Sequence, residues 1–118
     1  MISFKKLIYS FKNGFRGLKV GCVENNFRIM ITIGFLALLG VIYFPLEKWE
    51  SVLIIFLIGS VISIELVNSQ FERVLDIVKP TYDKKVKNVK DISAGAVLVI
   101  SLTALVIGLI IFIPYFLN

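Results

Sequence analysis

Two long stretches without charge constrain this chain more than any other feature of its sequence. Ile29–Leu46 contains 18 consecutive uncharged residues, and Ile92–Asn118 contains 27. About 20 mostly apolar residues are enough for a helix to cross the hydrocarbon core of a bilayer. A third stretch, 51–71, is uncharged over 21 residues only if Glu65 is tolerated within it. The sequence therefore predicts an all-α membrane protein with three transmembrane helices, at 27–46, 51–72 and 92–116.

The composition limits both the number of domains and the available chemistry. The chain has 118 residues and is 58% hydrophobic, above the roughly 45–50% of ordinary soluble domains. We expect residues 1–118 to form a single membrane-embedded domain, with no separate soluble catalytic domain. Cys22 is the only cysteine and no histidine occurs, so an intrachain disulfide is impossible and the commonest zinc ligand is missing. Any metal would be held mainly by carboxylates, which favours magnesium.

The amino-terminal segment has a different pattern from the spans. Its apolar residues recur every three or four positions, at Phe4, Leu7, Ile8, Phe11, Phe15 and Leu18. This spacing predicts an apolar stripe along a helix, and lysines and arginines lie mostly off that stripe. We predict that 1–26 forms an amphipathic helix on the membrane surface. An anionic membrane is the expected partner of these basic residues, and nucleic acid is not.

The distribution of basic residues predicts an orientation. Lysines and arginines are concentrated in the first 28 residues and in the connector 73–91, whereas the segment after 92 has none. Cytoplasmic loops carry the excess of basic residues. We therefore expect the amino terminus and the 73–91 loop to be cytoplasmic and the carboxy terminus to lie outside.

A polar stripe runs along the second predicted span. Glu65, Asn68, Glu72 and Asp76 are spaced by three, four and four residues, which places them on one face of a helix. Ionisable residues within a membrane are costly and usually mark function. A seam of polar contacts between helices is the alternative, but such contacts contribute on average only about 0.6 kcal/mol in lipid. The stripe thus favours catalysis, transport or ion binding over packing.

Burying this stripe also favours self-association. Three spans and one surface helix can scarcely shield Glu65, Asn68 and Glu72 from lipid. The third span begins with small residues at 93–96, which permit close approach of another helix.

Three ordered motifs then suggest a family. They are Glu24-Asn25-Asn26-Phe27-Arg28 before the first span, the Glu65–Asp76 stripe with the pattern ExxNxxxExxxD, and KDISAGAVL from Lys90 to Leu98. The combination closely resembles the small bacterial integral-membrane lipid kinases, the diacylglycerol kinase and undecaprenol kinase family. A P-loop motif is absent from the sequence, and so are CxxC, HExxH and GxSxG.

The resemblance implies an ATP- and magnesium-dependent kinase that phosphorylates the hydroxyl of a membrane lipid. It implies a homotrimer in the bacterial inner membrane, with active sites between subunits at the cytoplasmic face. By the same resemblance, Glu65 would be the general base and Asn68 would position the reacting groups. Glu24 and Glu72 would hold the metal, and the nucleotide would be bound by Glu24, Glu72, Asp76, Lys90 and Asp91.

Two points stay open at the level of sequence. Gln70 and Phe71 are bulkier than the residues the family usually has there, and they leave the lipid substrate undecided between undecaprenol, which we favour, and diacylglycerol. The alternative function is a small oligomeric transporter or channel whose intramembrane carboxylates bind an ion or proton. That alternative assigns no evident role to Glu24 or to the Lys90-Asp91 pair.

Overall fold

The protein is all-helical in the computed structural model, which describes residues 2–79 and 83–118. Its helices follow one another along the described chain as α1 (Phe4–Gly21), α2 (Asn25–Tyr43), α3 (Lys48–Val78) and α4 (Lys84–Leu117). Of these, α2, α3 and α4 are long and apolar enough to cross a membrane. The expectation of three such helices is confirmed.

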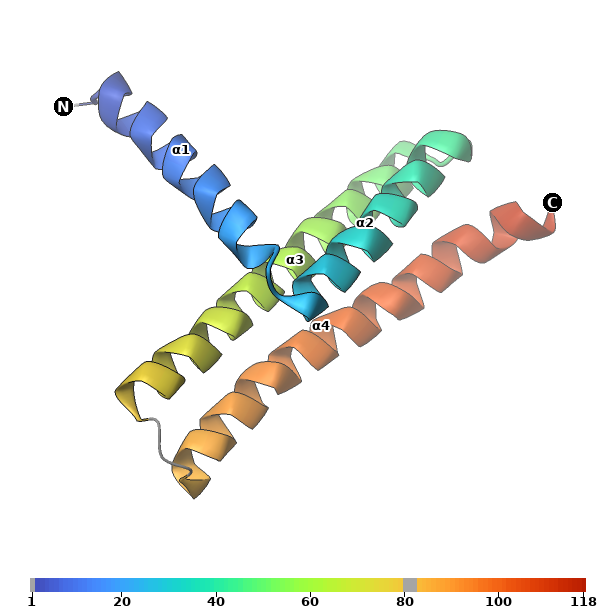
Figure 1. Ribbon diagram of the computed structural model, residues 1–118. Helices are drawn as coiled ribbons and strands as arrows, with labels where there is room; N and C mark the ends of the chain where they lie inside the picture. Colours follow the sequence, from blue (N-terminus) through green and yellow to red (C-terminus); the bar gives the residue numbers. More distant parts are fainter. Residues whose placement is uncertain (1, 80–82) are drawn as a thin grey trace.

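The first helix stands apart from the other three. α1 points away from the bundle that α2, α3 and α4 form (Figure 1), and all of its residues except Gly21 are exposed. It begins after Ser3, whose hydroxyl accepts a hydrogen bond from the backbone N–H of Lys6, as N-cap residues commonly do. Its predicted position on a membrane surface stays a prediction.

Glycines on α2 allow the close packing of the bundle. α3 packs against both α2 and α4. A Cβ atom added to Gly34 would lie 3.0 Å from Ile58 on α3, and one added to Gly40 would lie 2.9 Å from the Phe112 ring on α4. Small residues let helices in lipid approach closely in this way. At Gly95, one of the small residues predicted to do so on the third span, an added Cβ would meet nothing within 4 Å.

The connector predicted at 73–91 is mostly helical. α3 continues to Val78, and α4 already begins at Lys84 after Asp83, whose carboxylate accepts a hydrogen bond from the backbone N–H of Lys85. That hydrogen bond, with the Lys79 ammonium 3.0 Å away, holds the pKa of Asp83 below its ordinary value. The Asp83 N-cap thus starts α4 ahead of its apolar segment, and lysines, which are good helix formers, occupy much of its first turns. Residues 80–82 of this connector lie outside the described residues.

A buried acid ties the opposite ends of α3 and α4 together. Glu50 forms a capping box with Glu47 at the start of α3, and its side chain accepts a hydrogen bond from the Tyr115 hydroxyl near the end of α4. Trp49 donates its ring N–H to Glu47 at 2.6 Å. This acid is therefore satisfied by hydrogen bonds at the end of the bundle remote from Glu65.

The corner between α1 and α2 is fixed by one large side chain. Phe27 is 0% exposed, and it lies beside Gly21, where an added Cβ would also meet Leu66 of α3 at 2.8 Å. Replacing a fully buried phenylalanine by alanine typically costs about 3–5 kcal/mol. We expect Phe27→Ala to lower the SDS concentration at which the purified protein unfolds in mixed micelles, measured by circular dichroism. Phe11→Ala, at an exposed position of α1, is the control, and equal midpoints for the two variants would contradict the packing role.

Candidate functional site

The polar stripe of α3 divides into a buried and an exposed half. Glu65 is 4% exposed and Asn68 is 7% exposed, whereas Glu72 and Asp76, one and two turns further on, are exposed. All four belong to one unbroken helix, so the spacing read from the sequence gives one face, as predicted. The buried half of the stripe lies beside the corner between α1 and α2, because the neighbouring Leu66 packs against Gly21.

Glu24 reaches this region from the corner. It is the N-cap residue of α2, but its side chain makes no capping hydrogen bond. Its carboxylate oxygen Oε1 instead accepts hydrogen bonds from Nη2 of Arg73 at 2.8 Å and from Nε of Arg73 at 3.2 Å. The ion pair links the corner to α3, 49 residues further along the chain.

Three acids share this part of the molecule. The negative charges of Glu72 and Glu24 both act on the Glu65 carboxylate. Like charges near one another are unfavourable unless a cation offsets them. Arg73 supplies one such charge, and its role was missed at the level of sequence because a single helix period gives no sign of a partner 49 residues away.

Two buried side-chain oxygens have no hydrogen-bond partner in the described part of the chain: Oγ of Ser101 on α4 and Oδ1 of Asn68 in the polar stripe. The side-chain oxygen Oδ1 of Asn68 is buried, and none of the described residues donates a hydrogen bond to it. The next residue, Ser69, is also buried, and its hydroxyl bonds to the backbone oxygen of Leu66. A buried acceptor without a donor costs about 1–3 kcal/mol. Asn68 is thus suited to accept a hydrogen bond from outside the described chain.

Three of the predicted nucleotide-binding residues, Asp76, Lys90 and Asp91, lie in two separate ion pairs. Lys90 of α4 donates to Asp76 of α3 at 2.6 Å, so the structure brings these two together. Asp91 is instead paired with Lys87 at 2.7 Å, within α4. Asp76 belongs to the last turn of α3, and Lys87, Lys90 and Asp91 belong to the first turns of α4. These ends of α3 and α4 extend past the start of α2, at the lower left of Figure 1.

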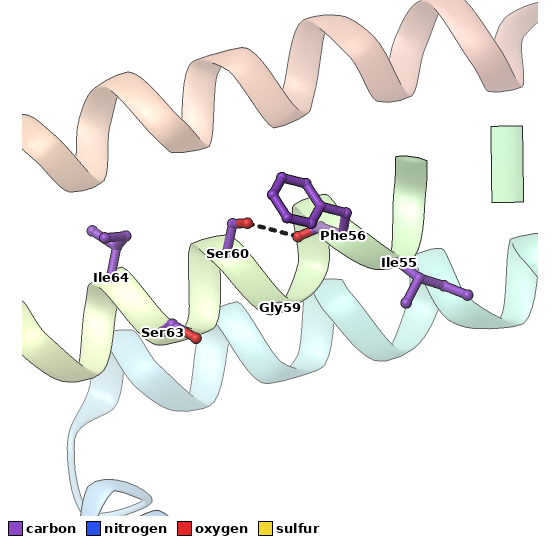
Figure 2. A pocket seen from close by; sticks show the side chains of 6 residues that line it. All are labelled: Ile55, Phe56, Gly59, Ser60, Ser63 and Ile64. Atoms are coloured by element: carbon purple, nitrogen blue, oxygen red, sulfur yellow. Dashed lines mark hydrogen bonds between the residues drawn. The ribbon is translucent and has the colours of Figure 1, made fainter. Parts of the chain in front are cut away.

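An apolar groove follows α3 toward the buried acid. It has a volume of about 470 Å³ and is lined by Ile55, Phe56, Gly59, Ser60, Ser63 and Ile64. The Ser60 hydroxyl donates to the backbone oxygen of Phe56 at 2.7 Å, shown by the dashed line in Figure 2, so it presents little free polarity to the groove. Ile64, one of the lining residues, directly precedes Glu65, which does not itself line the groove. The apolar walls suit a hydrocarbon chain.

Magnesium is the divalent cation that the acids of this site suit best. Glu24 and Glu72 offer carboxylate oxygens, the hard ligands that magnesium takes. Within residues 2–79 and 83–118, no three His, Cys, Asp or Glu side chains are grouped closely enough to hold a metal ion. Magnesium is usually bound by only one or two carboxylates together with waters and substrate phosphates. The donor chemistry therefore fits an ion that arrives with phosphates.

Comparisons with known proteins agree with these features. The profile described as prokaryotic diacylglycerol kinase matches residues 12–112. The chain is also similar to the undecaprenol kinase of Bacillus subtilis (strain 168), with 33% identity over 113 residues, covering 89% of this chain and 86% of the relative.

The Lys90–Asp76 pair is expected to contribute little to stability. Their side chains are 34% and 67% exposed, and exposed ion pairs are worth about 0.2–1 kcal/mol. Asp76→Asn should therefore lower the free energy of unfolding by less than about 1 kcal/mol. SDS titration of the purified variant measures this, with Asp91→Asn as the matched loss of an exposed pair. A loss several times larger for Asp76→Asn alone would show that the pair is structural.

Proposed function

The chain belongs to the prokaryotic diacylglycerol kinase family and is a multi-pass membrane lipid kinase, and from this premise we propose how it acts. It transfers the γ-phosphate of ATP to the hydroxyl of a membrane lipid, undecaprenol rather than diacylglycerol. The observation that carries the proposal is the burial of Glu65 in a helix able to span a membrane, on the face that also carries Glu72, while Arg73 of the same helix holds Glu24. A carboxylate held there can meet an alcohol that never leaves the bilayer.

Glu65 acts as the general base in this proposal. It takes the proton of the lipid hydroxyl while the hydroxyl oxygen forms a bond to the γ-phosphorus of ATP. The bond from that phosphorus to the bridging oxygen breaks, and ADP leaves. Asn68 helps to position the reacting groups, and its partnerless Oδ1 supports this role because it can accept a hydrogen bond from one of them.

Phosphoryl transfer depends mainly on positioning and on neutralising charge. Glu24 and Glu72 would hold magnesium, which when bound offsets the charge of the ATP phosphates. Lys90 contacts phosphate, and Asp76 and Asp91 belong to the nucleotide region. Their position past the start of α2, outside the apolar part of the bundle, supports contact with a water-soluble nucleotide. We propose that this end faces the cytoplasm and that the carboxy terminus lies outside.

The complete site is proposed to need other copies of the chain. Glu72 is exposed, Asn68 has a buried oxygen without a donor, and the small-residue start of α4 faces open space at Gly95. Each of these features is explained if a second helix bundle packs there. We therefore keep the proposal of a homotrimer, in which the number three comes from the family resemblance.

Two observations support undecaprenol as the lipid substrate: the apolar groove on α3 and the similarity to the Bacillus subtilis protein. An apolar chain lying in the groove of Figure 2 would run along the stretch of α3 that directly precedes Glu65. The similar Bacillus subtilis protein is an undecaprenol kinase, which supports a prenol as substrate. Gln70 and Phe71 are both exposed on α3, so they can contact the lipid that occupies this side of the helix.

Glu65→Gln is expected to abolish lipid phosphorylation while the protein still folds. A glutamine keeps the size of the side chain but cannot accept the hydroxyl proton, and loss of a general base typically costs about 10²–10⁴ in rate. The measurement is transfer of ³²P from labelled ATP to a prenol in mixed micelles, with and without magnesium. Removal of magnesium by EDTA should abolish transfer by the unmodified protein.

Glu50→Gln is the matched control for that experiment. Glu50 is also a buried acid of α3, but it lies at the other end of the helix and is satisfied by hydrogen bonds. We expect this variant to retain activity. Comparable activity in Glu65→Gln, or comparable loss in Glu50→Gln, would contradict the assignment of the base.

The proposed lipid preference is tested separately. With undecaprenol and diacylglycerol at equal mole fractions in one mixed micelle, we expect undecaprenol phosphate to form faster. Product ratios from thin-layer chromatography give the ratio of kcat/KM values directly. Preferential formation of phosphatidic acid would overturn the choice of substrate but not the kinase activity.

A further inference from the structure

The ion pair between Glu24 and Arg73 has an unusual geometry for an N-cap acid. An acid at this position commonly accepts a hydrogen bond from the first turn of its own helix, but Glu24 makes no such bond. Both donors of Arg73 converge on its Oε1 atom, at 2.8 and 3.2 Å. The carboxylate is thus held toward α3 by a side chain that the catalytic scheme does not use.

Arg73 and a metal ion would need the same oxygen. The proposed function assigns Glu24 to magnesium, and a guanidinium cannot lose its charge under these conditions. The same region contains the negative charges of Glu65 and Glu72. The Arg73 guanidinium, already bonded to Oε1 of Glu24, therefore neutralises part of the negative charge that a divalent cation would neutralise. The two cations compete for this oxygen.

The pair is also weak enough to open. The two side chains are 40% and 35% exposed, and partly exposed ion pairs change an equilibrium constant by at most a factor of about five. Arginine has a long, flexible stem, so its head can move while α3 stays in place. The ion pair between Arg73 and Glu24 can therefore form and break reversibly, and it does not need to be a permanent link between the corner and α3.

We propose that Arg73 is a positioning residue that holds the Glu24 carboxylate beside α3 and must release it when the divalent cation binds. Arg73 thereby lowers the affinity of the site for free metal. This inference rests on the proposed function, because it takes Glu24 as a metal ligand. Beyond that function, Arg73 competes with the metal ion and so sets the affinity of the site for metal.

The test is direct binding of Mn²⁺ alone to the purified full-length protein in detergent micelles. Electron paramagnetic resonance measures the free ion, and added Mg²⁺ should displace the bound Mn²⁺. We expect Arg73→Met to bind Mn²⁺ about two- to fivefold more tightly than the unmodified protein. Arg73→Gln removes the charge but keeps a hydrogen-bond donor, and it gives the same expectation if the methionine variant does not fold.

A matched control and a double variant identify the cause. Arg16→Met removes the same charge from an exposed position of α1 and should leave Mn²⁺ affinity unchanged. Glu24→Gln should weaken binding, and adding Arg73→Met to it should bring no gain, because the contested oxygen is no longer charged.

The outcomes separate this inference from the function on which it rests. Unchanged or weaker Mn²⁺ binding by Arg73→Met, or no binding by any variant, would overturn the inference. A gain of the same size in the Glu24→Gln background would also overturn it, since the effect would not run through Glu24. If Glu24→Gln leaves the affinity of the unmodified protein unchanged, the assignment of Glu24 to the metal fails instead.

Discussion

The arrangement of this bundle depends on keeping a carboxylate within a helix that crosses the membrane. A charged side chain near the bilayer centre costs at least about 2.5–3.5 kcal/mol on insertion scales, so Glu65 has to be covered by protein. The corner between α1 and α2 packs directly beside it, where Gly21 lets α1 end against Leu66, the residue after Glu65, and Phe27 fills the space next to Gly21. The same corner carries Glu24, whose carboxylate bonds to Arg73 of α3. The packing of this corner therefore brings a second acid to the helix that carries Glu65.

Bringing acids together raises the question of how their repulsion is tolerated. Arg73 bonds to Glu24, and Lys90 bonds to Asp76 one helix further on. Both cations come from the same end of the α3–α4 pair that carries the acids. A site that binds phosphates through metal, as we propose for this protein, has to hold negative charge before its ligand arrives, and internal cations that can be displaced would make this possible. The exposed positions of these pairs keep them weak, which suits groups that exchange partners.

Much of this arrangement could be predicted from the sequence, and the remainder could not for identifiable reasons. The three long helices follow from the uncharged stretches, and the common face of Glu65, Asn68, Glu72 and Asp76 follows from the helix period. α3 and α4 both extend beyond the predicted spans. The length of an apolar stretch predicts which part of a helix lies in lipid, but it does not predict where the helix ends. Arg73 lay off the polar stripe and had no local partner, so only the fold could pair it with Glu24. The glycine contacts of α2 likewise require knowledge of which helix lies opposite.

The two buried acids of α3 show how a structural acid differs from one available for chemistry. Glu50 accepts hydrogen bonds from the Glu47 backbone and the Tyr115 hydroxyl, and these donors join the start of α3 to the end of α4. The charges that act on Glu65 are those of Glu72 and Glu24, which have the same sign as its own, and the nearby Asn68 keeps a buried oxygen without a donor among the described residues. Folding alone would favour satisfying these groups, because unpaired buried polar atoms destabilise the protein. This contrast with the hydrogen-bonded acid at the other end of the helix supports the proposal that Glu65 and Asn68 act on substrates.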